Sequence, residues 1–324
     1  MIVDVHAHLF PPDFLRRVEE HGGALPRLSA APLSSLSLAE RVELMDRVGV
    51  DLQVLSVGVL QPYYEDPKVA VDLAKQANEC YLETCETFAG RFATFIALPL
   101  PHLDAALAEL DRLVGEPRVA GVAMSTSVLG RQLDDPVFAP LYAELDRRAL
   151  TVFLHPTMLY DGFGPNSYGM DRSVGAMFED TIAAVRLLLS GVLVRNPRLR
   201  IIVPHLGGTL PFIHGRIASH VRRAEDGWRS SGIAEGSGSS EEGVRRLFYD
   251  TAMRHAPALR CACDTVGHDR LVFGTDFPYV KTPEEFADRI EHVRGLPVPE
   301  DAKAGILGAT AAGLLGLALP ESRR

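Results

Sequence analysis

Five side chains that can bind a metal ion or carry a proton lie at the ends of apolar runs. They are His6 and His8 in "IVDVHAH", His155 in "FLHP", His205 in "IVPHLGG" and Asp276 in "VFGTDFP". Neutral imidazoles and one carboxylate together suit Zn²⁺ or a similar divalent ion. The expected ligands of that ion are His6, His8, His155 and Asp276.

The fifth group, His205, is not among the expected ligands and can carry a proton. His205 would be free to act as an acid or base next to water bound to the ion, whose pKa such an ion lowers to about 7. Asp276 is a second candidate, because it could alternate between ligand and acid. The expected catalytic residues are therefore His205 and Asp276.

The apolar runs themselves predict a parallel α/β architecture. Strands are expected over 2–5, 52–57, 92–98, 119–125, 151–156, 200–205, 247–251 and 270–276. Helices are expected between them over 38–49, 67–90, 103–115, 135–149 and 178–197, with Gly or Pro near their ends. Eight β/α units in this length predict a (β/α)8 TIM-like barrel, and a doubly wound sheet is the alternative.

This architecture explains where the histidines stand. Residues two apart on a strand point to the same side, so His6 and His8 share one face. In a (β/α)8 barrel the carboxyl ends of the strands carry the active site. A lone histidine at a strand end is more often a hydrogen-bonded structural residue. Five such groups at four strand ends instead favour a metal site.

The composition narrows the class of protein. The chain has 324 residues, 47% of them hydrophobic, and a net charge of −9, which disfavours nucleic acid as a partner. Four cysteines without zinc-ribbon spacing, and no apparent signal peptide, predict reduced thiols in a cytoplasmic protein. No apolar run is long enough to cross a membrane, so no membrane partner is expected.

The expected organisation is one barrel domain over 1–324. Three segments interrupt the β/α alternation and are expected to be mobile insertions: 22–37, 157–177 and the Gly/Ser-rich 227–243.

Several stretches resemble the amidohydrolase superfamily, and more narrowly its amidohydrolase-2 branch, which contains non-oxidative decarboxylases. They are "DVHAHLFPPDF", "FLHPT", "LLLSGVLVRNPRLRIIVPHLGGTLPF" and "VFGTDFPY". The resemblance implies a (β/α)8 barrel with one divalent metal ion, usually in a dimer. It also implies that Arg216 binds a substrate carboxylate, which suits guanidinium chemistry, although a helix surface charge would look the same in the sequence.

These observations predict a metal-dependent non-oxidative decarboxylase of a small aromatic or unsaturated carboxylic acid. The expected cofactor is one divalent ion, Zn²⁺ first and Mn²⁺ as its competitor. A hydrolase or hydratase that acts on a small carbonyl, lactone or conjugated acid is the alternative, because the same site residues suit both chemistries. A binding protein that lost catalysis would be expected to have lost some of the metal ligands. All five groups are present in this sequence, which disfavours that alternative.

Overall fold

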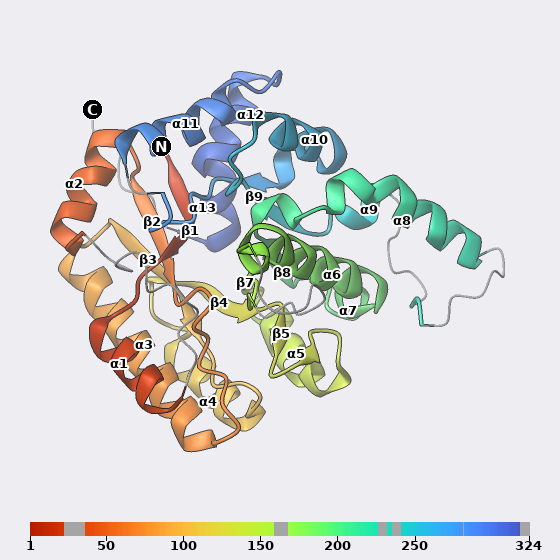
Figure 1. The fold of residues 1–324 in the computed structure, drawn as a ribbon. Coiled ribbons are helices and arrows are strands. Elements are labelled where there is room, and N and C mark those ends of the chain that lie inside the picture. Colours follow the sequence, from red (N-terminus) through yellow and green to blue (C-terminus); the bar gives the residue numbers. More distant parts are fainter. Residues whose placement is uncertain (23–35, 159–167, 226–231, 235–240, 281, 318–324) are drawn as a thin grey trace.

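Eight parallel strands form a nearly closed barrel surrounded by helices (Figure 1). The computed structural model describes residues 1–22, 36–158, 168–225, 232–234, 241–280 and 282–317. The barrel strands, in spatial order, are β1 (Val3–His8), β2 (Leu52–Ser56), β3 (Phe92–Ala97), β4 (Val119–Ser125), β7 (Thr151–His155), β8 (Arg200–Val203), β9 (Phe248–Asp250) and β10 (Leu271–Val272). A short antiparallel pair, β5 (Ser127–Val128) and β6 (Arg131–Gln132), follows β4.

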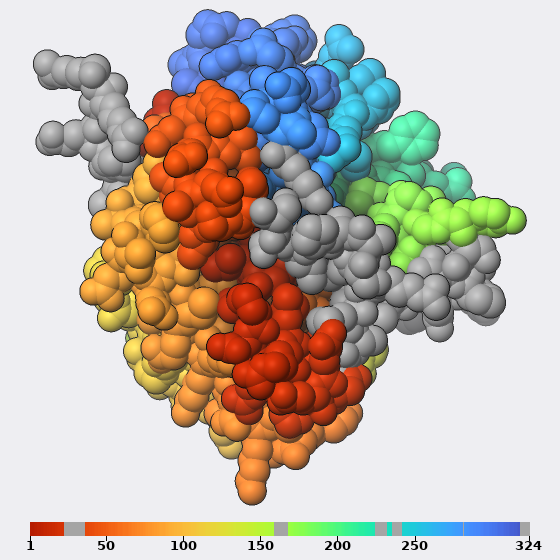
Figure 2. Space-filling model, turned by 60° about the vertical axis from the view of Figure 1, so that its left-hand side comes forward, coloured from red at the N-terminus to blue at the C-terminus, as the bar shows by residue number. Residues whose placement is uncertain are grey.

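Contacts between the first and last strands close the barrel. The backbone N–H of Val5 donates to the carbonyl of Phe273 at 2.9 Å, and Ala7 forms a parallel bridge with Phe277. Figure 2 shows the same closure at the surface, where the orange-red α2 (Leu38–Val48) lies against the blue α11 (Pro283–Arg294). The predicted barrel is therefore confirmed. A doubly wound sheet would leave the first and last strands apart.

The helices form the outer layer, except for α13, which covers the amino ends of the strands. They are α1 (Pro12–Glu20), α2, α3 (Pro67–Thr87), α4 (Leu103–Leu113), α5 (Ala139–Arg147), α6 (Ala176–Leu189), α7 (Val192–Arg195), α8 (Leu210–Glu225), α9 (Glu241–Val244), α10 (Ala256–Val266), α11, α12 (Glu300–Ala304) and α13 (Thr310–Leu315). The α11 helix begins with a capping box, in which the Thr282 and Glu285 side chains each bond the other's backbone N–H. That cap fixes the start of the helix that carries Arg289, a residue that lines a cavity at the carboxyl end of the barrel.

One predicted helix is two helices in the structure. The sequence predicts a single helix over 178–197, but α6 ends at Leu189 and α7 begins at Val192. Gly191 between them has φ 77°, a left-handed conformation that glycine adopts without the Cβ penalty and that ends a helix.

A β-bulge in β1 places both histidines. Asp4 pairs with Gln53 and Ala7 pairs with Leu55, so three steps along β1 match two along β2. Val5 belongs to the apolar cluster with Phe153, and Ala7 to the larger cluster that includes the helices. The extra residue lets β1 fill the barrel with Val5 and still direct His6 and His8 to its carboxyl end.

The barrel interior is a small packed core below the site. Phe95 and Phe153 stack with ring centroids 5.1 Å apart, and Leu314 of α13 belongs to the same cluster. The carbonyl of Leu314 accepts bonds from Thr151 and Arg200, the first residues of β7 and β8. The α13 helix therefore lies at the amino ends of the strands, which leaves the carboxyl ends for chemistry.

Parts of the predicted insertions lie outside the described residues. These are 23–35 of the first segment, 159–167 of the second, and 227–231 and 235–240 of the third, so the predicted mobility of the insertions stays a prediction. Within the described part of the chain, no helix combines the length and apolar character needed to cross a bilayer.

The close approach of β4 and β7 makes Gly121 a test of the fold. A Cβ at Gly121, whose φ is 152°, would lie 2.1 Å from the carbonyl oxygen of Thr151 on the neighbouring strand. We expect Gly121→Ala to lower the free energy of unfolding by more than about 2 kcal/mol, measured by urea denaturation. Gly115→Ala is the control, since nothing lies within 4 Å of its added Cβ. Equal stability of the two variants would contradict the strand spacing.

Candidate metal centre

Four of the predicted residues come together at the carboxyl end of the barrel. Ligand atoms of His6, His8, His155 and Asp276 all lie within 4.8 Å of one another. The Nε2 atoms of His6 and His8 are 3.1 Å apart, and Asp276 Oδ1 lies 3.1 Å from the first and 3.2 Å from the second. The three histidines are buried, and Asp276 is 21% exposed.

Hydrogen bonds on the far side of each ring fix which nitrogen faces this cluster. Nδ1 of His6 lies 2.7 Å from the Asp250 carboxylate, and Nδ1 of His155 lies 2.9 Å from the carbonyl of Pro156. Both partners only accept, so each Nδ1 carries a proton and Nε2 is directed to the cluster. Nδ1 of His8 lies 2.9 Å from Ser56 Oγ. Such outer bonds orient histidine ligands and raise their basicity.

The protonation states of the rings differ with their neighbours. Burial lowers the pKa of His8 to about 4 and that of His155 well below its usual value, so both are neutral. Burial also opposes charge on His6, but the carboxylates of Asp250 and Asp276 outweigh it and raise its pKa to about 9. A cation held between His6 and Asp276 would take the place of that proton.

The cluster fits a divalent metal ion. Ligand atoms bound about 2.1 Å from one ion lie about 3.0–3.4 Å apart at angles between right-angled and tetrahedral. The measured spacings of 3.1 and 3.2 Å among His6, His8 and Asp276 match this range. Three imidazoles and a carboxylate are the donor set of zinc and related ions. The half-buried Asp276 faces the cavity, where a coordination position could stay open.

His205 lies beside the cluster and is held by a second carboxylate. Its Nδ1 is 2.9 Å from Asp180 Oδ2, and its Nε2 is 3.8 Å from Asp276 Oδ2. Burial disfavours charge on the ring, but both carboxylates outweigh it and raise the pKa of His205 well above its usual value. The pKa of Asp276 is held well below its usual value, because the neighbouring histidines outweigh its burial. Both shifts favour an imidazolium at His205 next to a carboxylate at Asp276.

Unusual backbone conformations position both groups. His205 has φ 51° and Asp276 has φ 64°, in the left-handed region that non-glycine residues rarely adopt. The N–H of His205 donates to Asp250 at 2.9 Å, and the N–H of Asp276 donates to the carbonyl of His6 at 2.8 Å. After His205, the chain passes so close to α6 that a Cβ on Gly208 would lie 2.0 Å from the Met177 carbonyl. These contacts explain the glycines in "HLGG".

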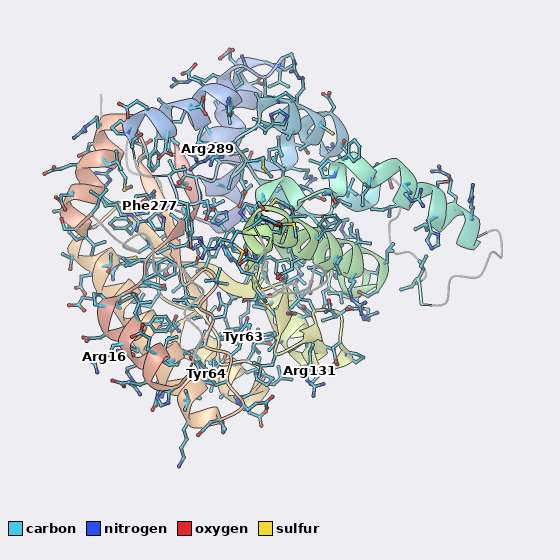
Figure 3. The ribbon with its side chains drawn as sticks, in the orientation of Figure 1. Arg16, Tyr63, Tyr64, Arg131, Phe277 and Arg289 are labelled. Atoms are coloured by element: carbon cyan, nitrogen blue, oxygen red, sulfur yellow. The ribbon has the colours of Figure 1, made fainter. Side chains whose placement is uncertain are left out.

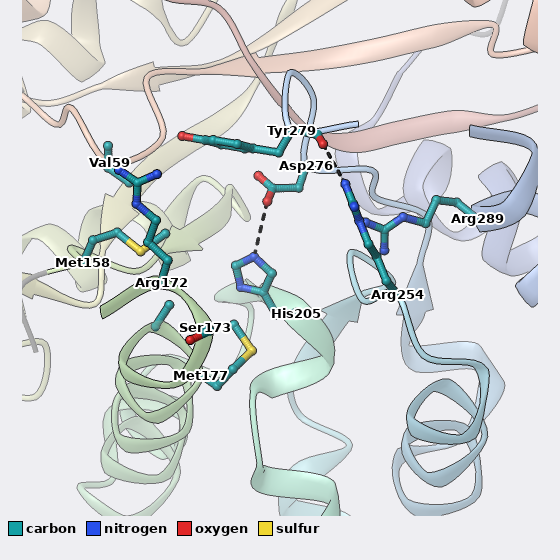
Figure 4. A pocket seen from close by; sticks show the side chains of 11 residues that line it. Val59, Met158, Arg172, Ser173, Met177, His205, Arg254, Asp276, Tyr279 and Arg289 are labelled. Atoms are coloured by element: carbon teal, nitrogen blue, oxygen red, sulfur yellow. Dashed lines mark hydrogen bonds and ion pairs between the residues drawn. The ribbon is translucent and has the colours of Figure 1, made fainter. Parts of the chain in front are cut away.

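A cavity of about 520 Å³ opens onto these groups (Figure 4). It is lined by Val59, Met158, Arg172, Ser173, Ala176, Met177, His205, Arg254, Asp276, Tyr279 and Arg289. In Figure 4, His205 and Asp276 lie at its centre, with Val59, Met158 and Arg172 on one side and the cationic wall of Arg254 and Arg289 on the other. An organic acid of one ring fits such a volume.

Arg216 does not line this cavity. It lies on α8, which extends away from the barrel in Figure 1, and its side chain is exposed. Phe212, one turn earlier, is 85% exposed. The predicted role of Arg216 therefore stays a prediction that depends on another surface coming close to α8.

The sequence analysis missed several residues of the candidate site. Asp250 is the last residue but one of the predicted strand 247–251 and the last residue of β9. A carboxylate near the end of an apolar strand is the same signal that identified Asp276. Asp180 lies inside a mostly apolar helix and shows no such signal. The three arginines of the cavity come from segments that the motifs do not include: Arg172, Arg254 and Arg289.

The chain belongs to the amidohydrolase family, whose model matches residues 3–317. It is similar to the 2-amino-3-carboxymuconate-6-semialdehyde decarboxylase of Dictyostelium discoideum, with 27% identity over 86% of this chain and 76% of that protein. It is also similar to the 6-methylsalicylic acid decarboxylase of Penicillium expansum, with 28% identity over 93% and 92% of the two chains. These similarities confirm the family predicted from the sequence.

Two further similarities bear on fold and chemistry. The solved apo structure of IDCase from Metarhizium anisopliae superposes with a TM-score of 0.80, with 27% identity over 98% of this chain and 97% of that one. A 2-keto-4-carboxy-3-hexenedioate hydratase from Sphingobium sp. (strain NBRC 103272 / SYK-6) is 24% identical over 85% of this chain and 83% of that protein. Both decarboxylases and a hydratase are thus relatives of this chain.

The bond from His6 to Asp250 generates a prediction about metal affinity. We expect Asp250→Asn to weaken binding of Zn²⁺ about 10- to 100-fold, because a neutral amide is a weaker acceptor for the N–H of the His6 ring. The measurement is competition with a chromophoric chelator. Asp269→Asn, which changes a surface carboxylate paired with Arg245, is the control. Unchanged affinity in Asp250→Asn would show that this bond does not support a metal site.

Proposed function

We propose that the chain is a metal-dependent, non-oxidative decarboxylase of a small aromatic or unsaturated carboxylic acid. The observation that carries the proposal is the cavity itself, in which the His205–Asp276 pair lies between a mixed wall, with apolar side chains and Arg172, and the cationic wall of Arg254 and Arg289. The decarboxylases among its relatives support the same chemistry.

The proposed reaction replaces the carboxylate by a proton. An ion held by His6, His8, His155 and Asp276 would bind the substrate carboxylate and withdraw charge from it. His205, oriented by Asp180, donates the proton of Nε2 to the carbon that bears the carboxylate, and a C–H bond forms. The bond from that carbon to the carboxylate then breaks, its electron pair returns to the ring or conjugated system, and CO₂ leaves. His205 regains its proton from solvent.

The donor set supports a proposal for the identity of the ion. Three imidazoles with one carboxylate favour Zn²⁺, and Mn²⁺ is its competitor because the carboxylate donor suits harder ions as well. Loading the protein with each ion and comparing activity per bound ion decides between them.

Arg216 and the oligomer form one proposal. An arginine exposed on α8 beside the exposed Phe212 could bind a substrate carboxylate only in the cavity of another copy, so we propose a homodimer. Arg216→Gln would then raise KM while metal content stays unchanged.

We also propose a cytoplasmic location for the protein, in keeping with its four free cysteines.

Hydration or hydrolysis by the same residues is the second candidate. The hydratase among the relatives favours this candidate, because it indicates that the same fold can support hydration as well as decarboxylation. The two reactions differ in their products, because decarboxylation releases CO₂ and the alternatives consume water.

The test is a product screen with the metal-loaded protein. Hydroxybenzoates and muconate-type acids labelled with ¹³C at the carboxyl group are incubated with it, and ¹³CO₂ is measured. We expect ¹³CO₂ from at least one acid. Products enriched in ¹⁸O from labelled water, without ¹³CO₂ from any acid, would instead support hydration or hydrolysis.

Asp180 is a positioning residue, and its role can be tested separately. Its Oδ2 is bonded to His205, and its Oδ1 has no hydrogen-bond partner within the described part of the chain. We expect Asp180→Asn to lower kcat about 10- to 100-fold with KM and metal content nearly unchanged, because the ring loses its orientation and its charge partner. Asp264→Asn, on the exposed side of α10, is the control. A loss confined to KM or to metal content would contradict this role.

A further inference from the structure

The cationic wall of the cavity contains a buried arginine whose donors are not all used. Arg289 projects from α11 inside the ring of helices, whereas Arg16 and Arg131 lie at the outer edge of the molecule (Figure 3). Its side chain is 5% exposed. Its Nη1 is buried and has no hydrogen-bond partner among the described residues. Since an unpaired buried N–H of a charged group is costly, a ligand acceptor would account for this arrangement.

A second guanidinium lies next to the first. Arg254 lines the same wall, where its Nη2 donates to the carbonyl of Tyr279 at 2.7 Å and lies 3.4 Å from Glu285. Burial and the charge of Arg254 together lower the pKa of Arg289. Figure 4 shows the two guanidinium groups side by side. Like charges this close repel each other, and an anion bound between them would relieve the repulsion.

The wall lies within reach of the reacting centre. Arg254 and Arg289 line one continuous cavity with His205 and Asp276. The carboxylate of Asp276 is near enough to raise the pKa of Arg289 against the effect of burial. A ligand that places one carboxylate at the metal centre can therefore extend a second anionic group toward Arg289.

We propose that Arg289 and Arg254 form a subsite for a second carboxylate, so that the substrate is a small dicarboxylic acid rather than a monocarboxylic one. This rests on the proposed function, in which the first carboxylate lies at the metal centre. Guanidinium groups grip a carboxylate with two parallel hydrogen bonds, and Arg289 has a donor available for them.

The experiment compares matched mono- and dicarboxylic acids by calorimetric titration of the Zn²⁺-loaded protein. The probes are 2-hydroxybenzoate against its 3-, 4- and 5-carboxy derivatives, and hexa-2,4-dienoate against hexa-2,4-dienedioate. We expect the wild type to bind at least one diacid about 10-fold or more tightly than its monoacid. Arg289→Met should abolish that preference and leave the affinity for the monoacid within about twofold, and Arg289→Lys should restore part of it.

Three further variants complete the design. Arg254→Gln, at an exposed side chain that can change without disturbing the core, should lower the preference by a smaller factor. Arg294→Gln, in the last turn of the same helix, should leave it unchanged. Loss of the preference in Arg172→Gln but not in Arg289→Met would overturn the proposal, as would a wild type that binds no diacid more tightly than its monoacid.

Binding and turnover are read separately, so the two proposals can fail independently. If the diacid preference depends on Arg289 but no acid releases CO₂, the subsite stands and decarboxylation fails. If monoacids release CO₂ and Arg289→Met affects monoacids and diacids equally, decarboxylation stands and the subsite fails.

Discussion

The carboxylate of Asp250 is the group on which the rest of the site depends. It is fully buried, and it accepts bonds from the ring of His6 and from the backbone N–H groups of His205 and Ala252. A charge removed from water must be satisfied by the protein. The bonds of Asp250 therefore join β1 to β8 and β9 at the level of the candidate metal centre. The same bonds hold in place His6 of the candidate metal centre and His205, the proposed proton donor.

A second buried carboxylate, that of Asp4, joins neighbouring strands on the outer side of the sheet. Asp4 accepts from Gln53 and from both the N–H and the hydroxyl of Thr275, one residue before Asp276. Arg41 bonds Gln53 and the carbonyl of His8, and its guanidinium lies 4.1 Å from the ring centroid of Phe277. The same contacts therefore close the barrel and position Asp276. A substitution that breaks them is expected to affect both the stability of the barrel and the position of Asp276.

The sequence predicted the parts of this design that depend on strand order. Apolar runs that end in His6, His155, His205 and Asp276 are visible in the chain, and parallel strands bring their carboxyl ends together. The predicted strand 270–276 is regular only over Leu271–Val272, although Phe273 and Asp276 still form backbone hydrogen bonds with β1.

The remaining features depend on tertiary contacts that a linear pattern does not contain. The bulge in β1 depends on pairing with β2, and Asp180 gains its role only because α6 passes His205. Arg289 occupies an ordinary position in an amphipathic helix, and only the rotation of α11 against the barrel turns it toward the cavity. Packing of helices against the barrel therefore places the charged side chains of the cavity, whereas the order of the parallel strands places the proposed metal ligands.

The most direct test of the account is the metal content and coordination of the purified protein. Elemental analysis and X-ray absorption should show about one divalent ion per chain, bound by imidazole nitrogens and a carboxylate oxygen, and Asp276→Ala should lose it. A wild-type protein that retains no ion after loading with Zn²⁺ or Mn²⁺ would contradict the metal centre from which the proposed chemistry follows.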